Sequence, residues 1–477
     1  MTVSPEFKKK TSFDRIIETG AVTASWLVPL IVYSFTLAPG VTAGDSGDFI
    51  VAVHRFSLPH PPGYPLYMLL AKIWTIIPIN LGADPFAVKM NMFSMVAMVV
   101  SCAIFYRLLK ILTGSIAASL GSVMIFAFSR TVWKFALVTE VYALGVLLIL
   151  LVLLGLAIAS EGNPKGLILS AVSFGLGLAH HHSIILLVPL MVVLWPRGKD
   201  SARVKFPVLL ACLILPLILY LLIPVMVARS PQYKESGFTF RDFIETVTRA
   251  EYRERADYQD LPPEQLVRSS DILDRATRYL PKQFGWFILA MCLAGWFIPP
   301  ANRRIWGLMV AVTSGLWIFS LVYFSRGSPL GMPFSYLRSI DEFMIPVNIF
   351  LAMGFAWLLA PLSYRLTRKN DFAGTEGLNL IPREFVPVAI ALLFCVPAIF
   401  LGMTNAKFSN QTLRTFVQDQ ARNVLEQVPE NGVLVVSGDE IYLFEYLKEV
   451  RGIRRDVELV VYPFVRLVEA GGGQRVI

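Results

Sequence analysis

The sequence predicts an α-helical protein that crosses a membrane many times. Hydrophobic residues make up 55% of the 477-residue chain and charged residues only 16%, whereas a soluble domain carries about a quarter charged residues. The mean hydropathy is +0.60. Apolar stretches long enough to span a bilayer, about 17–25 residues each, recur along the chain. The uninterrupted ones cover residues 21–38, 88–106, 114–129, 141–159, 206–228, 283–299, 305–325, 343–361 and 385–402.

Short basic loops between these stretches set the expected orientation, because Lys and Arg gather in loops that face the cytoplasm. All the basic loops can lie there only if residues 166–195, interrupted by Gly175, Gly177 and three histidines, cross the membrane twice. The alternative is a single long tilted helix, which would move every later loop to the other side. The double crossing gives about eleven helices, with the N-terminus in the cytoplasm and the C-terminus outside.

The expected organisation is one transmembrane domain followed by a small module. The transmembrane domain covers residues 1–402, with a first outer loop at 39–87 and a long outer loop at 229–282. Two stretches of the long loop have the pattern of amphipathic helices that lie at the membrane surface; they cover residues 238–252 and 263–279. Residues 403–477 alternate helical and strand patterns, which predicts an extracytoplasmic α/β module whose completeness the sequence leaves open.

Several other classes are disfavoured. The net charge of +9 does not indicate nucleic-acid binding, because the basic residues lie in short clusters between apolar runs. Four cysteines lie inside apolar runs without CxxC spacing, so we expect buried thiols instead of disulfides or metal ligands; they are Cys102, Cys212, Cys292 and Cys395. The basic N-terminal segment precedes an apolar run without a good cleavage site, which predicts an uncleaved first transmembrane helix.

The first outer loop contains the strongest candidate for a catalytic site. Asp45 and Asp48 lie three residues apart just after a helix exit, a spacing that lets both carboxylates face one way on a helical turn. One can act as general base on a hydroxyl while the other orients it. The alternative is a helix cap formed by Asp45 or Ser46. The proline-rich stretch that follows presents His60 and Tyr64, and for Tyr64 the alternative is an ordinary place in the interfacial aromatic belt.

A second candidate group lies at the lip of two predicted helices, where the sequence places Glu140 and Tyr142. A carboxylate at membrane depth is costly, so it usually faces a cavity or a cationic partner. Arg130 or Lys134 can supply that partner for purely structural reasons. The sequence leaves both interpretations open.

The triplet His180-His181-His182 is a third candidate. Adjacent residues on a helix point about 100° apart, so at most one or two of these rings can share a metal ion. A divalent metal is therefore not supported. Hydrogen bonding of His180 and His181 to a phosphate or hydroxyl, or simple polarity at the interface, are the remaining interpretations.

Arginines at the outer lip suit a lipid-linked phosphate, which they bind through charge-assisted bidentate hydrogen bonds. Arg229 follows a helix exit, Tyr252 and Arg253 lie in the long outer loop, and Arg338 and Glu342 precede another helix. The alternative for the arginines is contact with lipid headgroups.

Together these motifs resemble the protein O-mannosyltransferase-like membrane family, whose animal member mannosylates plexin-type receptor domains. Asp45-Ser46-Gly47-Asp48 followed by His60-Pro61-Pro62-Gly63-Tyr64-Pro65 is its main signature. Further similar segments lie at residues 140–142, 177–181, 251–253 and 342–346, and the tail resembles the soluble extension of bacterial relatives. The resemblance covers nearly the whole chain.

The resemblance implies a GT-C type glycosyltransferase that takes a sugar, mannose or another hexose, from a polyprenyl-phosphate carrier. Such enzymes use an acidic residue of the first outer loop as base. By position Asp45 matches the family's Asp, whereas Asp48 stands where the family more often has Glu. We therefore expect Asp45 to be the base and Asp48 its helper, with no obligatory cofactor. The expected partners are membrane lipid, the lipid-linked donor and a protein or glycan acceptor, at the outer face of a bacterial plasma membrane.

The main alternative function is a transporter or flippase of lipid-linked sugars. Its signature would be broken helices in paired halves with charges buried at mid-membrane. The acidic residues here cluster at one face, and the sequence shows no inverted repeat. A receptor or scaffold, the third class, leaves the carboxylates of the outer loop unexplained.

Overall fold

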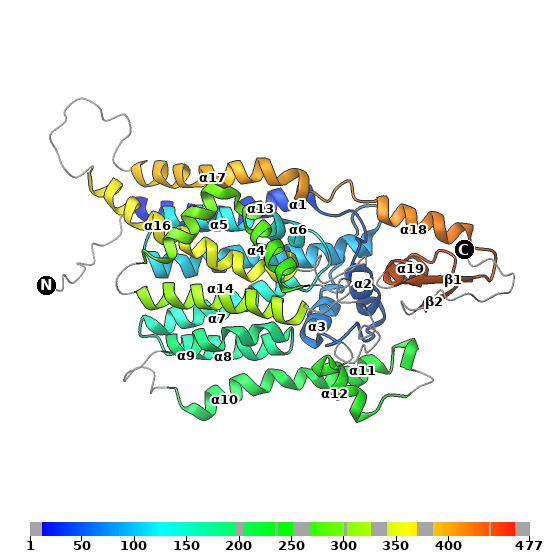
Figure 1. Ribbon diagram of the computed structural model, residues 1–477. Coiled ribbons are helices and arrows are strands. Elements are labelled where there is room, and N and C mark those ends of the chain that lie inside the picture. Colours follow the sequence, from blue (N-terminus) through cyan, green and yellow to red (C-terminus); the bar gives the residue numbers. More distant parts are fainter. Residues whose placement is uncertain are drawn as a thin grey trace.

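The computed structural model of the protein describes residues 12–195, 204–233, 237–250, 268–299, 303–325, 341–369, 385–437 and 440–462. Long helices lie side by side in one bundle (Figure 1). Short elements gather beyond one end of this bundle, and we call that end the polar end. They are α2 (Ser46–Arg55), α3 (Pro65–Trp74), α18 (Phe416–Gln427), β1 (Val433–Ser437), α19 (Ile441–Glu449) and β2 (Glu458–Tyr462).

The apolar stretches that were predicted to span are helical, but in the described part of the chain fewer than the predicted eleven helices are long enough to cross a membrane, and residues 206–228 form three consecutive short helices. Within the described residues, six helices are long and apolar enough to cross a membrane, and a bent pair makes up to seven. The other apolar stretches are shorter or interrupted helices. The bundle consists of α1 (Ser12–Thr36), α4 (Pro85–Thr113), α5 (Ile116–Ala127), α7 (Tyr142–Ser160), α8 (Lys165–Leu178), α9 (Val188–Leu194), α10 (Phe206–Ile214), α11 (Leu222–Val227), α13 (Ser269–Trp296), α14 (Arg304–Ser325), α16 (Ile345–Lys369) and α17 (Val386–Ser409).

The stretch at residues 166–195 is broken at the histidines, as predicted. Helix α8 ends at Leu178, and the chain continues as the 3₁₀ helix η1 (His182–Leu187) and then α9. The imidazole of His181 accepts a hydrogen bond from the backbone N–H of Ser183 and so caps η1. The break places the histidines at the end of two short limbs instead of inside one long helix.

The long outer loop differs partly from the prediction. The first amphipathic stretch forms α12 (Phe240–Thr248), which begins with a capping box between Thr239 and Asp242. The second stretch is not a separate surface helix, because α13 runs from Ser269 into the bundle with a kink at Gly285, where φ is 68°. Glycine tolerates this left-handed backbone, so one helix bends where the sequence suggested two.

The segment between α5 and α7 contains the short helix α6 (Arg130–Ala136). Its axis is bent by 69° from that of α5. Helix α6 therefore leaves the direction of the bundle and carries the chain across the polar end to Glu140.

The tail forms the predicted elements in the predicted order. Strands β1 and β2 pair in parallel, with Val433 opposite Glu458 and Ser437 opposite Tyr462. Parallel strands need a crossover connection, which α19 supplies. We call residues 416–437 and 440–462 the C-terminal module.

Candidate active site

The acidic loop, residues 44–48, lies at the polar end of the bundle. Its first carboxylate, Asp45, does not cap the helix that follows, α2. Asp45 occupies the N-cap position of α2, yet its side chain makes no capping hydrogen bond. Gly44, with φ of 88°, turns the chain immediately before it. The side chain of Asp45 is 34% exposed, whereas that of Asp48 is 11% exposed. The cap interpretation is therefore wrong for Asp45, and its carboxylate faces the site instead.

His60 links the two carboxylates. Its backbone N–H donates to Asp48 Oδ2 at 3.0 Å, and its Nδ1 lies 2.6 Å from the same oxygen. On the other side of the ring, Nε2 lies 3.1 Å from the Tyr64 hydroxyl and 3.6 Å from Asp45 Oδ2. One imidazole thus joins Asp48, Asp45 and Tyr64 in a single polar network, which we call the Asp45–His60–Asp48 network.

The pKa values of this network are shifted by burial and by neighbouring charge. Burial first, and the carboxylate of Asp48 next, raise the pKa of Asp45, while the charge of His60 lowers it. Burial alone would lower the pKa of His60, but Asp45 and Asp48 together outweigh burial and raise that pKa. Asp45 is therefore a stronger base than a free aspartate, and His60 holds its proton more tightly than a free histidine.

Aromatic packing fixes the rings of this network. The buried Phe49 ring lies 5.2 Å from both the His60 and the Tyr64 rings, centroid to centroid. The backbone of Tyr64 is left-handed, with φ of 43°, directly after Gly63, where φ is 83°. Such a conformation in a bulky residue needs surrounding structure to hold it. The proline-rich turn and Phe49 provide that structure.

A second pair of carboxyl groups lies next to the loop. Glu140 is buried, and its Oε1 would lie 3.8 Å from a Cβ at Gly44. The Tyr142 hydroxyl donates to Glu342 Oε2 at 3.0 Å. Burial first, and then the charge of Asp45, raise the pKa of Glu140 well above its usual value. Burial raises the pKa of Glu342 to about 7, with Lys134 opposing the rise.

A buried asparagine holds the loop against Glu140. Asn91 of α4 donates to the carbonyl oxygens of Ala38 and Gly40, both at 3.0 Å. It also accepts from the Thr139 hydroxyl at 2.7 Å. Sequence reasoning missed this residue, although a fully buried amide inside an apolar helix is a signal of this kind of role.

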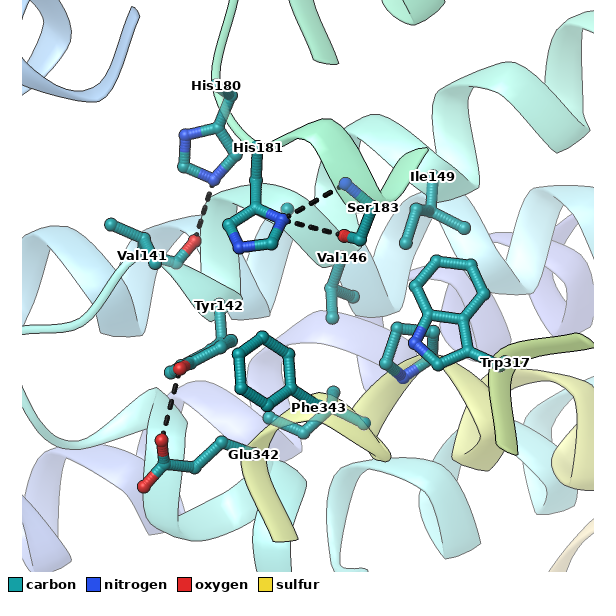
Figure 2. Close-up of a pocket in the computed structure, with 13 residues that line it drawn as sticks. Val141, Tyr142, Val146, Ile149, His180, His181, Ser183, Trp317, Glu342 and Phe343 are labelled. Atoms are coloured by element: carbon teal, nitrogen blue, oxygen red, sulfur yellow. Dashed lines mark hydrogen bonds between the residues drawn. The ribbon is translucent and has the colours of Figure 1, made fainter. Parts of the chain in front are cut away.

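The histidine turn completes the wall of the site. His180 Nε2 donates to the Val141 carbonyl oxygen at 2.9 Å, and the His181 ring stacks on Tyr64 with centroids 6.1 Å apart. A groove opens beside these rings, between α7, the histidine turn and α14 (Figure 2). Polar side chains line one side of the groove and include Tyr142, His181 and Glu342. Apolar side chains line the other side and include Val146, Ile149 and Trp317 (Figure 2).

Of the three arginines predicted to bind the phosphate, only Arg229 lies within the described residues. Arg229 lies over the Phe56 ring at 5.5 Å, at the opposite end of α2 from Asp45, so the structure does not bring it to the carboxylates. Tyr252, Arg253 and Arg338 lie outside the described residues.

Arg249 is a cation that sequence reasoning missed. It forms the C-cap of α12, with φ of 58°, and its charge lowers the pKa values of Asp45 and His60. It lies two residues before the 251–253 segment that carried part of the family resemblance, and that position was the available signal.

Within the described residues, no group of three or more His, Cys, Asp or Glu side chains is arranged to hold a metal ion. The expectation that no metal is obligatory stays a prediction.

The chain is similar in sequence to proteins named protein O-mannosyl-transferases. Residues 45–202 match the sequence model of the protein O-mannosyl-transferase TMEM260 N-terminal domain. The predicted family resemblance is confirmed. The mouse protein O-mannosyl-transferase TMEM260 is 25% identical over 446 residues, and that of Dictyostelium discoideum is 24% identical over 473 residues. These alignments cover 90% of this chain but 60% and 55% of the relatives, so the chain spans little more than half of their length.

Solved structures show the fold. The Archaeoglobus fulgidus oligosaccharyltransferase tethered with an acceptor peptide superposes with a TM-score of 0.56 at 11% identity, over 95% of this chain and 65% of that one. ArnT from Cupriavidus metallidurans bound to undecaprenyl phosphate gives 0.52 at 13% identity, over 93% and 90%. Both are GT-C proteins. The chain has the GT-C fold, as predicted.

Proposed function

We propose that this chain is an inverting glycosyltransferase that moves a hexose from a polyprenyl-phosphate carrier to an acceptor hydroxyl. One observation supports this above all. Asp45 is a partly exposed carboxylate, engaged in no cap, whose charge acts on Glu342 in the lining of a groove that has a polar side and an apolar side. A lipid-linked sugar has the same two parts, a polar head and a hydrocarbon tail.

The groove explains how such a donor binds. The polyprenyl chain packs against the apolar side chains Val146, Ile149 and Trp317, since apolar surface gains about 25 cal/mol per Å² when it leaves water. The sugar and phosphate remain on the polar side of the groove, beside His181. Arg249 is the described cation whose charge reaches both Asp45 and His181, and its guanidinium suits a phosphate.

In the proposed reaction, Asp45 takes the proton of the acceptor hydroxyl while that oxygen attacks the anomeric carbon. The bond between this carbon and the phosphate oxygen breaks, and the phosphate monoester leaves with the electron pair. Attack from the opposite face inverts the anomeric configuration. A base with a raised pKa is better matched to neutral pH, and the network through His60 holds the Asp45 carboxylate in place.

The sugar and acceptor are inferred from the relatives. Both curated relatives are named protein O-mannosyl-transferases, so we propose mannose as the sugar and a protein hydroxyl as the acceptor. The basic loops of the sequence support placing the site on the outer face of the membrane. We propose that this membrane is a bacterial plasma membrane. A glycan acceptor and another hexose are the alternatives that product analysis separates.

The test is single-turnover release of polyprenyl phosphate by the purified full chain on addition of acceptor. Asp45→Asn keeps the shape of the side chain but cannot take a proton, so we expect release to slow by about 10²- to 10⁴-fold. Asp274→Asn, on the exposed side of α13, is the matched control and should release at the normal rate. Full activity of Asp45→Asn would exclude Asp45 as base.

The same experiment separates the alternative function. A transporter or flippase would move the lipid-linked sugar across a vesicle membrane without releasing polyprenyl phosphate. Absence of release by the wild-type chain with every sugar donor tested, together with movement of the intact lipid, would overturn the proposed function.

A further inference from the structure

The C-terminal module is docked against the helix that carries the acidic residues. Helix α19 lies beside α2 (Figure 1). A Cβ placed on Gly47 would lie 2.5 Å from the Tyr442 carbonyl oxygen and 2.7 Å from its carbon, so the two backbones touch where α2 has no side chain. Gly47 is flanked by Ser46 and Asp48, which places this contact inside the acidic loop.

A buried carboxylate outside the reaction network anchors the module. Asp84, the N-cap of α4, has a side chain only 5% exposed. It accepts hydrogen bonds from Gln418 Nε2 at 3.2 Å and from the Tyr446 hydroxyl, and it pairs with Arg451 Nη1 at 3.0 Å. All three partners belong to the C-terminal module. A buried charge that loses its partner is strongly destabilising, so this cluster favours the docked arrangement.

The module also holds both ends of the segment that carries Asp45. Before it, Gly40 is packed so closely on the Gln418 side chain that a Cβ would collide with it. After it, Arg55 at the end of α2 forms an ion pair with Glu449 of α19. Residues 40–55 are therefore fixed at the start, at Gly47 and at the end by one module.

The charge of the network reaches α19 as well. Glu445 lies on α19 one turn after Tyr442 and one turn before Glu449, hence on the face that meets α2. Burial first, and the carboxylate of Asp48 next, raise the pKa of Glu445 to about 7. A freely tethered binding module would show neither this burial nor this coupling.

We infer that the C-terminal module is part of the catalytic apparatus and positions Asp45 and Asp48, with Asp84 and Arg451 as the positioning residues. The inference rests on the proposed function. It assigns the module a role in the chemical step and not in donor binding, because the donor groove is formed by α7, the histidine turn and α14, away from Asp84.

The experiment compares Arg451→Met with Arg455→Met in the full chain. Arg455 is an exposed arginine of the same module whose side chain donates to the Lys448 carbonyl oxygen. Displacement of a reacting group by about 1 Å can reduce the rate 10²-fold. We therefore expect Arg451→Met to lower kcat by about 10- to 100-fold while the KM for donor changes little, and Arg455→Met to retain both. Arg451→Lys, which keeps the charge, should recover part of kcat.

Tyr446→Phe removes one hydroxyl from the cluster and serves if Arg451→Met fails to fold. Its kcat should fall in the same direction. The inference would be overturned by an unchanged kcat in folded Arg451→Met or Tyr446→Phe, or by an equal loss of kcat in Arg455→Met. In either case, release of polyprenyl phosphate by the wild-type chain would still support the proposed function. No release by the wild-type chain would instead reject the proposed function itself.

Discussion

At the scale of single residues, the structure gives two chemically identical carboxylates different surroundings. Asp48 accepts two hydrogen bonds from His60 and is nearly buried. Asp45 faces the other ring nitrogen at a longer distance and keeps a third of its side chain exposed. Separate environments are how sites give separate roles to paired acids. The geometry supports Asp45 as the group that meets the acceptor and Asp48 as the group that orients His60.

The pH dependence of His60→Asn tests this division. The charge of His60 lowers the pKa of Asp45, because a protonated imidazole stabilises the ionised carboxylate. Without it Asp45 holds its proton more tightly, so the acid limb of kcat/KM should move to higher pH. His54→Asn, at the other end of α2, should leave the acid limb in place. An acid limb that stays fixed or moves to lower pH in His60→Asn would contradict the assignment.

Residues that act through local sequence were predictable, and residues brought in by packing were not. Asp45, Asp48, His60 and Tyr64 lie within one short motif, so their proximity needed no knowledge of the fold. Arg249 reaches the site from the far end of α12. Its position depends on how distant segments pack, which neither hydrophobic periodicity nor helix-end signals report.

Arg229 is a residue whose local setting was predicted but whose distance from the site was not. Its place after a helix exit was correctly recognised, but an exit does not reveal which end of a neighbouring helix it meets. A helix of ten residues is about 15 Å long, and Arg229 lies at the wrong end of α2 for the carboxylates.

At the scale of elements, α2 depends on a glycine for its contact with α19. Gly47→Ala would push a methyl group into the Tyr442 backbone. Overpacking of this kind costs about 1–3 kcal/mol, so we expect a lower unfolding temperature and a lower kcat. Both are measurable on the purified chain by thermal unfolding and by release of polyprenyl phosphate.

The matched substitution is Gly315→Ala in α14, where a Cβ meets nothing within 4 Å. Alanine in a helix interior is favoured over glycine by about 0.5–1 kcal/mol, so this variant should be at least as stable as the wild type. Equal behaviour of the two variants would mean that the contact between α2 and α19 contributes neither stability nor activity.

The sequence predicted elements that have a strong hydrophobic period or a clear interruption in the apolar run. It did not predict a helix that continues across residues that usually end helices. The interruption at the histidines and the alternating tail gave α8, η1, α9 and the C-terminal module. Helix α13 contains Pro281 and the kink at Gly285, and both residues usually end a helix. These two residues are why the sequence predicted a separate surface helix. Tertiary packing keeps α13 continuous in spite of them.

At the scale of the whole molecule, the site forms where three distant segments meet. The acidic loop, the start of α7 and the segment before α16 supply Asp45, Tyr142 and Glu342, and the groove is lined by Tyr142 and Glu342 (Figure 2). The motif resemblance predicted the fold, and it supplied the chemistry that we propose. It could not locate the groove, because the groove exists only after α7, the histidine turn and α14 are packed.

The position of the groove in the packed bundle predicts how donor binding depends on the length of the polyprenyl chain. Ile149→Trp should fill the apolar side of the groove and displace the polyprenyl chain. Excluding about two methylene groups, each worth about 0.8 kcal/mol, corresponds to a rise of about tenfold in KM for a long-chain donor. A donor analogue whose chain is too short to pass Val146 should show little change in KM.

Ile218→Trp, on an exposed face of the 3₁₀ helix η3 (Leu215–Leu221), is the matched control and should leave both KM values unchanged. An equal rise for long and short donors would show that the chain lies elsewhere, because a blocked tail site must discriminate by chain length.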